Sequence, residues 1–85
     1  MFFTNEFNKP ENVIAAAQEE TVNVRDMRIL RANRSDRGWQ LKYIALDDDL
    51  PIAAIERSLS RRLGEMVSMV NLHYDFDTAA RMICA

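Results

Sequence analysis

The sequence predicts an α+β fold: one small domain of order α-β-β-α-β-α, with a three-stranded, mainly antiparallel sheet and helices packed on one face. Alternating apolar and polar residues indicate strands over 22–32, 39–46 and 67–76, and wider apolar spacing indicates helices around them. The 85 residues are 48% hydrophobic and 28% charged, a composition typical of folded domains rather than disordered ones. The chain is therefore treated as a single domain, residues 1–85.

The chain is expected to begin with an apolar arm over residues 1–7, followed by a helix over 8–20. Asn8 is a residue type that caps helix N-termini, and Pro10 is tolerated in a first helical turn. Glu11 lies three residues after Asn8, as the glutamate of a capping box does. These three residues together predict where the first helix begins.

A β-hairpin is predicted from the next two elements, strands 22–32 and 39–46. The alternation slips near Asp26, which predicts an irregularity in the first strand at that point. Residues 33–38 are rich in turn-forming types and end in Gly38, so they are expected to form the loop. The hairpin tip would then be strongly basic.

The second half of the chain is predicted to contain a helix over 49–64, a strand over 67–76 and a short helix over 78–84. Three consecutive aspartates and Pro51 suit the start of the longer helix, because acidic residues favour the positive end of the helix dipole. Gly64 is a suitable helix stop.

Basic residues are concentrated in and after the hairpin, although the chain as a whole has a net charge of −2. Five arginines recur at every third position from Arg25 to Arg37, and a second basic cluster follows in the long helix. Arginine suits bidentate contact with carboxylates and phosphates. The candidate partner-binding residues are Arg25, Arg28, Arg31, Arg34, Arg37, Arg57 and Arg61.

Three interpretations of these arginines stay open. The hairpin engages an acidic protein surface, it grips nucleic-acid phosphates, or its arginines only pair with acidic neighbours of the same chain. The negative net charge weighs against DNA, because nucleic-acid-binding domains usually carry a net basic surface. Trp39 and Tyr43 would be the aromatic residues that stack on bases, although they also suit a core. We therefore expect a non-enzymatic regulator or inhibitor that binds a protein, with a small nucleic-acid-binding module as the alternative.

Self-association as a homodimer is also predicted, because so short a chain buries a thin core and small domains often recover stability by oligomerising. The apolar residues expected to mediate it are Phe2, Phe3, Trp39 and Met69.

Catalytic, metal-binding and cofactor motifs are not expected. The chain has one histidine and one cysteine, His73 and Cys84, and only two glycines, so nucleophile–base pairs, cysteine zinc sites and glycine-rich phosphate loops lack their residues. Asp75 and Asp77 alternate with apolar residues beside His73, which favours the polar side of a strand over a metal site. The apolar runs are too short to span a membrane, and the N-terminus does not resemble a signal peptide, so a cytoplasmic location is expected.

Overall fold

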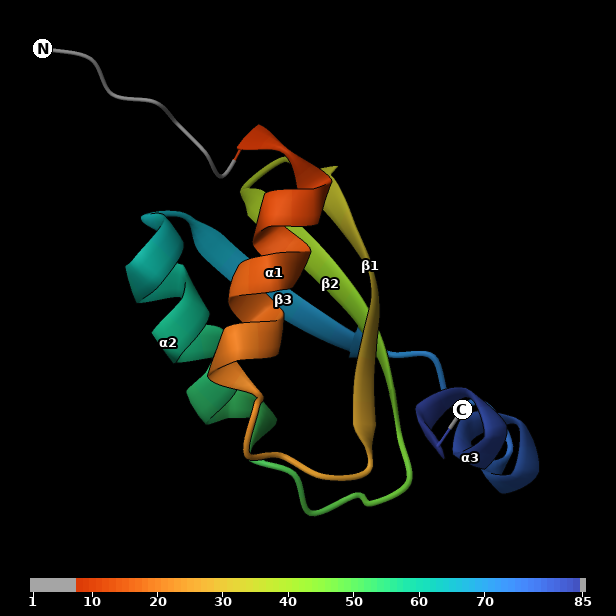
Figure 1. The fold of residues 1–85 in the computed structure, drawn as a ribbon. Helices are drawn as coiled ribbons and strands as arrows, with labels where there is room; N and C mark the ends of the chain where they lie inside the picture. Colours follow the sequence, from red (N-terminus) through yellow and green to blue (C-terminus); the bar gives the residue numbers. More distant parts are fainter. Residues whose placement is uncertain (1–7, 85) are drawn as a thin grey trace, which may run out of the picture.

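The computed structural model describes residues 8–84 and contains the six predicted elements in the predicted order (Figure 1). The expected arm at residues 1–7 lies outside the described residues. The elements are α1 (Pro10–Glu20), β1 (Met27–Ser35), β2 (Gly38–Ala45), α2 (Ile52–Leu63), β3 (Met66–Asn71) and α3 (Phe76–Cys84). One three-stranded sheet has the order β1-β2-β3. The predicted fold class is thus confirmed.

The sheet is mixed: β1 and β2 pair antiparallel, whereas β2 and β3 pair parallel. The hairpin loop is shorter than predicted, since only Asp36 and Arg37 separate the paired residues Ser35 and Gly38. Gly38 has φ +152°, and a side chain there would overlap the backbone carbonyl of Met66 on β3. Glycine therefore allows β2 and β3 to start side by side. The parallel pairing follows from α2, which lies between β2 and β3 in the chain as a crossover connection.

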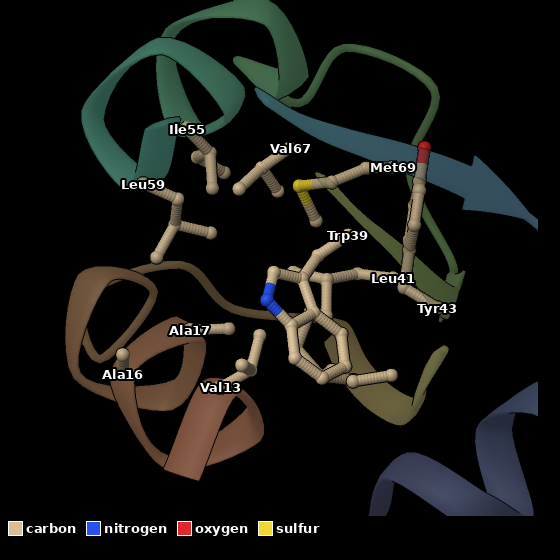
Figure 2. Packing of buried hydrophobic residues seen from close by; sticks show 12 residues of the cluster. Val13, Ala16, Ala17, Trp39, Leu41, Tyr43, Ile55, Leu59, Val67 and Met69 are labelled. Carbon is tan, nitrogen blue, oxygen red and sulfur yellow. The ribbon is translucent and has the colours of Figure 1, made fainter. Parts of the chain in front are cut away.

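The main core lies between the sheet and the two helices α1 and α2, which sit together on one side of the strands (Figure 1). Trp39 occupies its centre, surrounded by side chains from both helices and from β3 (Figure 2). The buried cluster comprises Val13, Ala16, Ala17, Ile29, Ala32, Trp39, Leu41, Tyr43, Ile55, Leu59, Val67 and Met69. Every second residue of β2 from Trp39 points into it, as the period of a strand requires.

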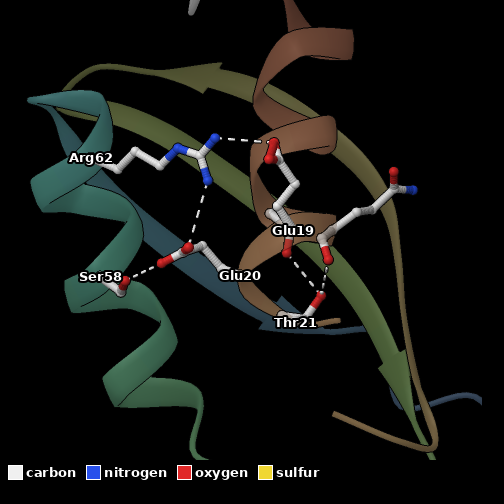
Figure 3. A network of polar contacts seen from close by, with 7 residues as sticks. Glu19, Glu20, Thr21, Ser58 and Arg62 are labelled. Atoms are coloured by element: carbon white, nitrogen blue, oxygen red, sulfur yellow. Dashed lines mark hydrogen bonds and ion pairs between the residues drawn. The ribbon is translucent and has the colours of Figure 1, made fainter. Parts of the chain in front are cut away.

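Polar contacts join the C-terminal end of α1 to α2 (Figure 3). The Glu20 carboxylate accepts a hydrogen bond from the Ser58 hydroxyl. Arg62 lies between two carboxylates, with its Nη2 atom 3.0 Å from Glu19 and its Nη1 atom 3.5 Å from Glu20. These contacts connect α1 and α2 at the surface, next to the core that the two helices share.

The third helix lies apart from the other two, near one end of the sheet (Figure 1). Ile44 of β2 and Ala79 of α3 are 0% and 1% exposed, yet neither belongs to the main core cluster. Ile44 points to the sheet face opposite Tyr43, because successive strand residues alternate between faces. The Arg28 Nη1 group also donates a 2.5 Å hydrogen bond to the carbonyl of Met82 in α3. The prediction of helices on one face therefore holds for α1 and α2, whereas α3 covers Ile44 on the other face.

The first strand begins later than predicted, because the chain turns after α1. Residues 21–23 are turn, and Val22 is 75% exposed instead of lying in a strand. The Thr21 hydroxyl donates to the Ala17 carbonyl, and the Val24 amide donates to the Thr21 carbonyl. The register shifts between Ile29 and Arg31, a few residues beyond the predicted irregularity.

The third strand ends earlier than predicted, at Asn71. The Asn71 side chain accepts a 2.8 Å hydrogen bond from the His73 amide, and His73 has a positive φ of 55°. This turn breaks the alternation that had suggested a strand to residue 76. Asp75 then accepts a 3.4 Å hydrogen bond from the Thr78 amide, and hydrogen bonds from Thr78 lower the Asp75 pKa. The last helix accordingly begins two residues earlier than predicted, at Phe76.

Both longer helices begin later than predicted and lack a side-chain N-cap. The N-cap positions are Lys9 for α1 and Pro51 for α2, and neither makes a capping hydrogen bond. One of the three aspartates forms a local turn instead, since Asp47 Oδ1 accepts from the Asp49 amide at 2.9 Å. The predicted stop of α2 is confirmed, because Gly64 adopts the left-handed conformation with φ 74°.

Candidate functional site

On the face of the sheet that points away from α1 and α2, α3 contacts β1 and β2, and Ile44 of β2 is fully buried. Strand alternation and the pairing register assign the remaining side chains to this face, which we call the open face. The open face comprises Arg31, Asn33, Gln40, Lys42, Met66, Ser68 and Val70. Within residues 8–84, no helix lies over this set.

The residues of the open face form rows across the three strands. One row contains Arg31, Lys42 and Val70, which are register partners on β1, β2 and β3. The next row toward the hairpin tip contains the amides of Asn33 and Gln40 and the hydroxyl of Ser68. The face is therefore basic and polar on β1 and β2, with apolar groups on β3, where Met66 is 54% and Val70 37% exposed.

Arg31 and Lys42 are two cations placed directly opposite one another on neighbouring strands. Neither side chain makes a hydrogen bond or ion pair with another residue of the described part of the chain. Like charges directly opposite on a sheet are destabilising, by up to roughly 1 kcal/mol relative to neutral pairs. The pair is thus unfavourable for folding and well suited to hold an anion.

A shallow depression of about 350 Å³ adjoins the hairpin loop at the end of the open face. Its lining residues are Ser35, Asp36, Arg37, Gln40, Met66 and Ser68. The Arg37 guanidinium is exposed and has no ion-pair partner in the described part of the chain. Together with Arg31 and Lys42, it supplies the positive charge of this surface.

Two of the candidate arginines are engaged within the fold. Arg34 lies 2.7 Å from the Glu65 carboxylate and 4.9 Å from the centroid of the Trp39 ring. The hydrogen bond from Arg34 is the main cause that lowers the pKa of Glu65. Arg28 binds the carbonyl of Met82. The side chains of Arg34 and Arg28 therefore make contacts within the fold.

Arg57 and Arg61 lie on α2, beside a groove of about 490 Å³ between that helix and β3. The groove is lined by Ala53, Glu56, Arg57, Ser60, Arg61, Met66, Val67 and Ser68. Met66 and Ser68 also line the depression at the hairpin, so the two basic surfaces meet at the start of β3. Arg25 is exposed ahead of β1 and lines neither hollow.

Side chains of α2 close the outer edge of β3. The Val67 amide donates a 2.9 Å hydrogen bond to the Ser60 hydroxyl, and the Met69 amide donates a 2.7 Å hydrogen bond to the Glu56 carboxylate. An added strand would need these same amide groups. At the other edge, β1 carries a register shift beside Arg31, a feature that disfavours edge pairing.

The four residues expected to mediate self-association fall into two groups, two in the core and two outside the described residues. Trp39 and Met69 are 2% and 9% exposed and belong to the core, so they offer no surface to a second copy of the folded chain. The Trp39 Nε1 group is buried without a hydrogen bond of ordinary geometry, although its proximity contributes slightly to the lowered pKa of Glu65. Phe2 and Phe3 lie outside the described residues. Within residues 8–84, the large apolar side chains that are exposed are Val22, Met66, Val70, Tyr74 and Phe76.

Sequence reasoning missed Lys42, which belongs to the site as much as any arginine. Its signal was present, because Lys42 is a polar position in the alternating segment that forms β2. Only the strand register, however, shows that it faces Arg31.

Other kinds of site find no support in residues 8–84. No three His, Cys, Asp or Glu side chains gather there in a way that would hold a metal ion, and His73, Asp75 and Asp77 do not share a strand. None of the described helices has the length and apolar character needed to cross a membrane. Comparison with protein-family models, with curated proteins and with solved structures found no significant match.

Proposed function

We propose that this chain is a non-enzymatic binding module, a small regulator or inhibitor, that recognises an acidic surface of a protein partner. The observation that carries the proposal is the facing pair of cations, Arg31 and Lys42, on an exposed sheet face without an acidic partner in the described part of the chain. A bound carboxylate would turn this repulsive pair into two favourable contacts. Arg37, at the hairpin end of the same face, would extend the contact.

A protein partner is favoured over nucleic acid by the burial of the two aromatic residues of the hairpin. Single-stranded nucleic acid is usually bound on exposed aromatic side chains that stack with the bases. Trp39 and Tyr43, the aromatic residues of the hairpin, are 2% and 6% exposed and point into the core. The net charge of −2 also disfavours a polyanion with closely spaced phosphates.

The proposal is tested by the binding of two labelled probes: a glutamate-rich peptide and a single-stranded DNA oligonucleotide of similar net charge. We expect the peptide to bind more tightly in fluorescence anisotropy. The double variant Arg31→Ala/Lys42→Ala is expected to bind the peptide more weakly, by up to about fivefold for each lost cation, because an exposed ion pair contributes up to about 1 kcal/mol. Lys9→Ala/Arg25→Ala is the matched control, since it removes two exposed cations from outside the open face. Preferential binding of the oligonucleotide, or an equal loss in the control, contradicts the proposal.

Homodimerisation is a separate proposal, supported by the small size of the domain and by apolar side chains outside the open face, such as Tyr74 and Phe76, that are exposed in the single chain. Sedimentation velocity over a wide concentration range tests it. A species of about twice the monomer mass is expected at high concentration. A constant mass of 9.8 kDa would exclude it.

A further inference from the structure

We infer that the occupant of the open face is an amphipathic, acidic helix of the partner protein, and this inference rests on the function proposed above. The helix would lie beside α3 on the same side of the sheet. Its carboxylates would reach the cations of β1 and β2, and its apolar stripe would cover the exposed side chains of β3.

The dimensions of the open face suit one helix. Its rows at Gly38, Gln40 and Lys42 extend over about 13 Å, at about 3.3 Å per residue along the strand. Three strands spaced by about 4.8 Å give a width of about 10 Å between the outer strands. A helix with its side chains is about 10–12 Å in diameter. The distance of about 13 Å along the strands, between α3 and the hairpin loop, therefore accommodates the diameter of one helix.

The distribution of side chains predicts which helix would fit. The cations Arg31 and Lys42 occupy the strands β1 and β2, while Met66 and Val70 are exposed on β3. An amphipathic helix carries its acidic residues and its apolar residues on adjacent faces. Glutamates on one face could contact Arg31 and Lys42 while the apolar face covers Met66 and Val70. A purely acidic extended segment would leave the two apolar side chains of β3 in water.

The sheet edges are less suited to binding than the face. A partner strand added to β3 would compete with Ser60 and Glu56 for the amides of Val67 and Met69. These hydrogen bonds make strand addition at this edge costly, because each displaced group needs a new partner. Docking on the face leaves both bonds in place.

The position of α3 is an example, within this chain, of a helix docked on this face. Arg28 lies one row beyond Arg31 and Lys42 on the same side, and its Nη1 group donates a hydrogen bond to the carbonyl of Met82 near the C-terminal end of α3. Ile44 of β2 and Ala79 of α3 are both buried, and α3 contacts β2. A second copy of this chain fits less well, since it would bring the same cations of both copies together.

The test uses two synthetic peptides of identical composition, observed by ¹H–¹⁵N NMR titration of the labelled full chain. One peptide places leucines on one helical face with glutamates beside them, and the other is scrambled to abolish that face. We expect the amphipathic peptide to shift the amides of Gln40, Ser68 and Val70 and to bind at least about tenfold more tightly than the scrambled one. Val70→Glu is expected to abolish this advantage, whereas Val22→Glu, which adds the same charge at an exposed position outside the open face, is expected to retain it.

The outcomes separate this inference from the proposed function. If both peptides bind equally and the Arg31→Ala/Lys42→Ala variant loses that binding, the proposal of an acidic partner is retained and the inference of a helix is overturned. Binding of the oligonucleotide in place of either peptide overturns both. Shifts of the same amides on raising the protein concentration alone, without peptide, would identify a second copy as the occupant and also overturn the inference.

Discussion

The guanidinium of Arg34 lies over the ring of Trp39, 4.9 Å from its centroid, and is held there by an ion pair with Glu65. Arg34 and Trp39 are register partners on β1 and β2, and Glu65 comes immediately before β3. The three residues thus join all three strands at the hairpin end of the sheet. An arginine selected from the sequence as a partner-binding residue therefore covers the centre of the core.

Arg34→Ala is expected to lower the free energy of unfolding by about 1 kcal/mol, because it removes an exposed ion pair and a cation–π contact. Arg37→Ala is the matched control, as Arg37 lies in the adjoining loop and has no such partners in the described part of the chain. Urea unfolding monitored by Trp39 fluorescence measures both variants. Equal stability of the two variants would show that the contact contributes nothing.

The same ion pair predicts a pH dependence. Arg34 holds the pKa of Glu65 in the folded chain below its ordinary value of 4.5. At a pH between the folded-state pKa and the ordinary pKa, the unfolded chain therefore binds more protons than the folded chain. The stabilisation is therefore complete above pH 4.5 and is lost as the pH falls through the folded-state pKa. Wild type and Glu65→Gln, compared by urea unfolding at several pH values, should differ by a constant amount near neutrality and converge in acid. A difference independent of pH would contradict the assignment.

The two glycines should respond differently to alanine. Gly38→Ala is expected to cost more than about 2 kcal/mol, because the methyl group would overlap the Met66 carbonyl and force β2 and β3 apart. Gly64→Ala is expected to cost only about 1 kcal/mol, since its φ of 74° is unfavourable for alanine but no atom lies within 4 Å of the added carbon. Thermal or urea unfolding gives both values, and an equal cost would show that the strands adapt to the added methyl.

Arg28 is expected to anchor α3. Arg28→Met keeps the aliphatic stem and removes the hydrogen bond to Met82, so the last turn of α3 should open about tenfold more often, which corresponds to about 1.4 kcal/mol. Amide hydrogen exchange of Ile83 and Cys84 measures this change. Arg31→Met, at the neighbouring exposed arginine without such a bond, should leave exchange in α3 unchanged. Unaltered exchange in Arg28→Met would mean that apolar packing alone holds the helix.

The element order could be predicted because each local signal agreed with the global fold. The alternation over β2 is regular, and Gly64 ends α2 as its φ requires. The parallel pairing of β3 was missed, although a helix between two strands is the usual crossover connection. The early end of β3 depends on a side-chain turn at Asn71, which a period-two pattern does not reveal.

The candidate site was predicted only in part, because strand faces depend on register. The spacing of three between the arginines does not indicate on which face of the sheet each arginine lies. The register shift between Ile29 and Arg31 determines which arginines of β1 lie on the open face. Arg31 and Arg37 belong to the proposed surface, while Arg28 and Arg34 make contacts within the fold. Lys42 becomes part of the surface only once its pairing with Arg31 is known.

The closure of the β3 edge by Ser60 and Glu56 has a consequence for the partly unfolded chain. Both closing groups belong to α2, so the edge is protected only while that helix stays docked. When α2 detaches, the amides of Val67 and Met69 and the apolar segment around them become free to pair with another chain. Strand pairing with another chain at this edge would therefore require only the local detachment of α2, not global unfolding.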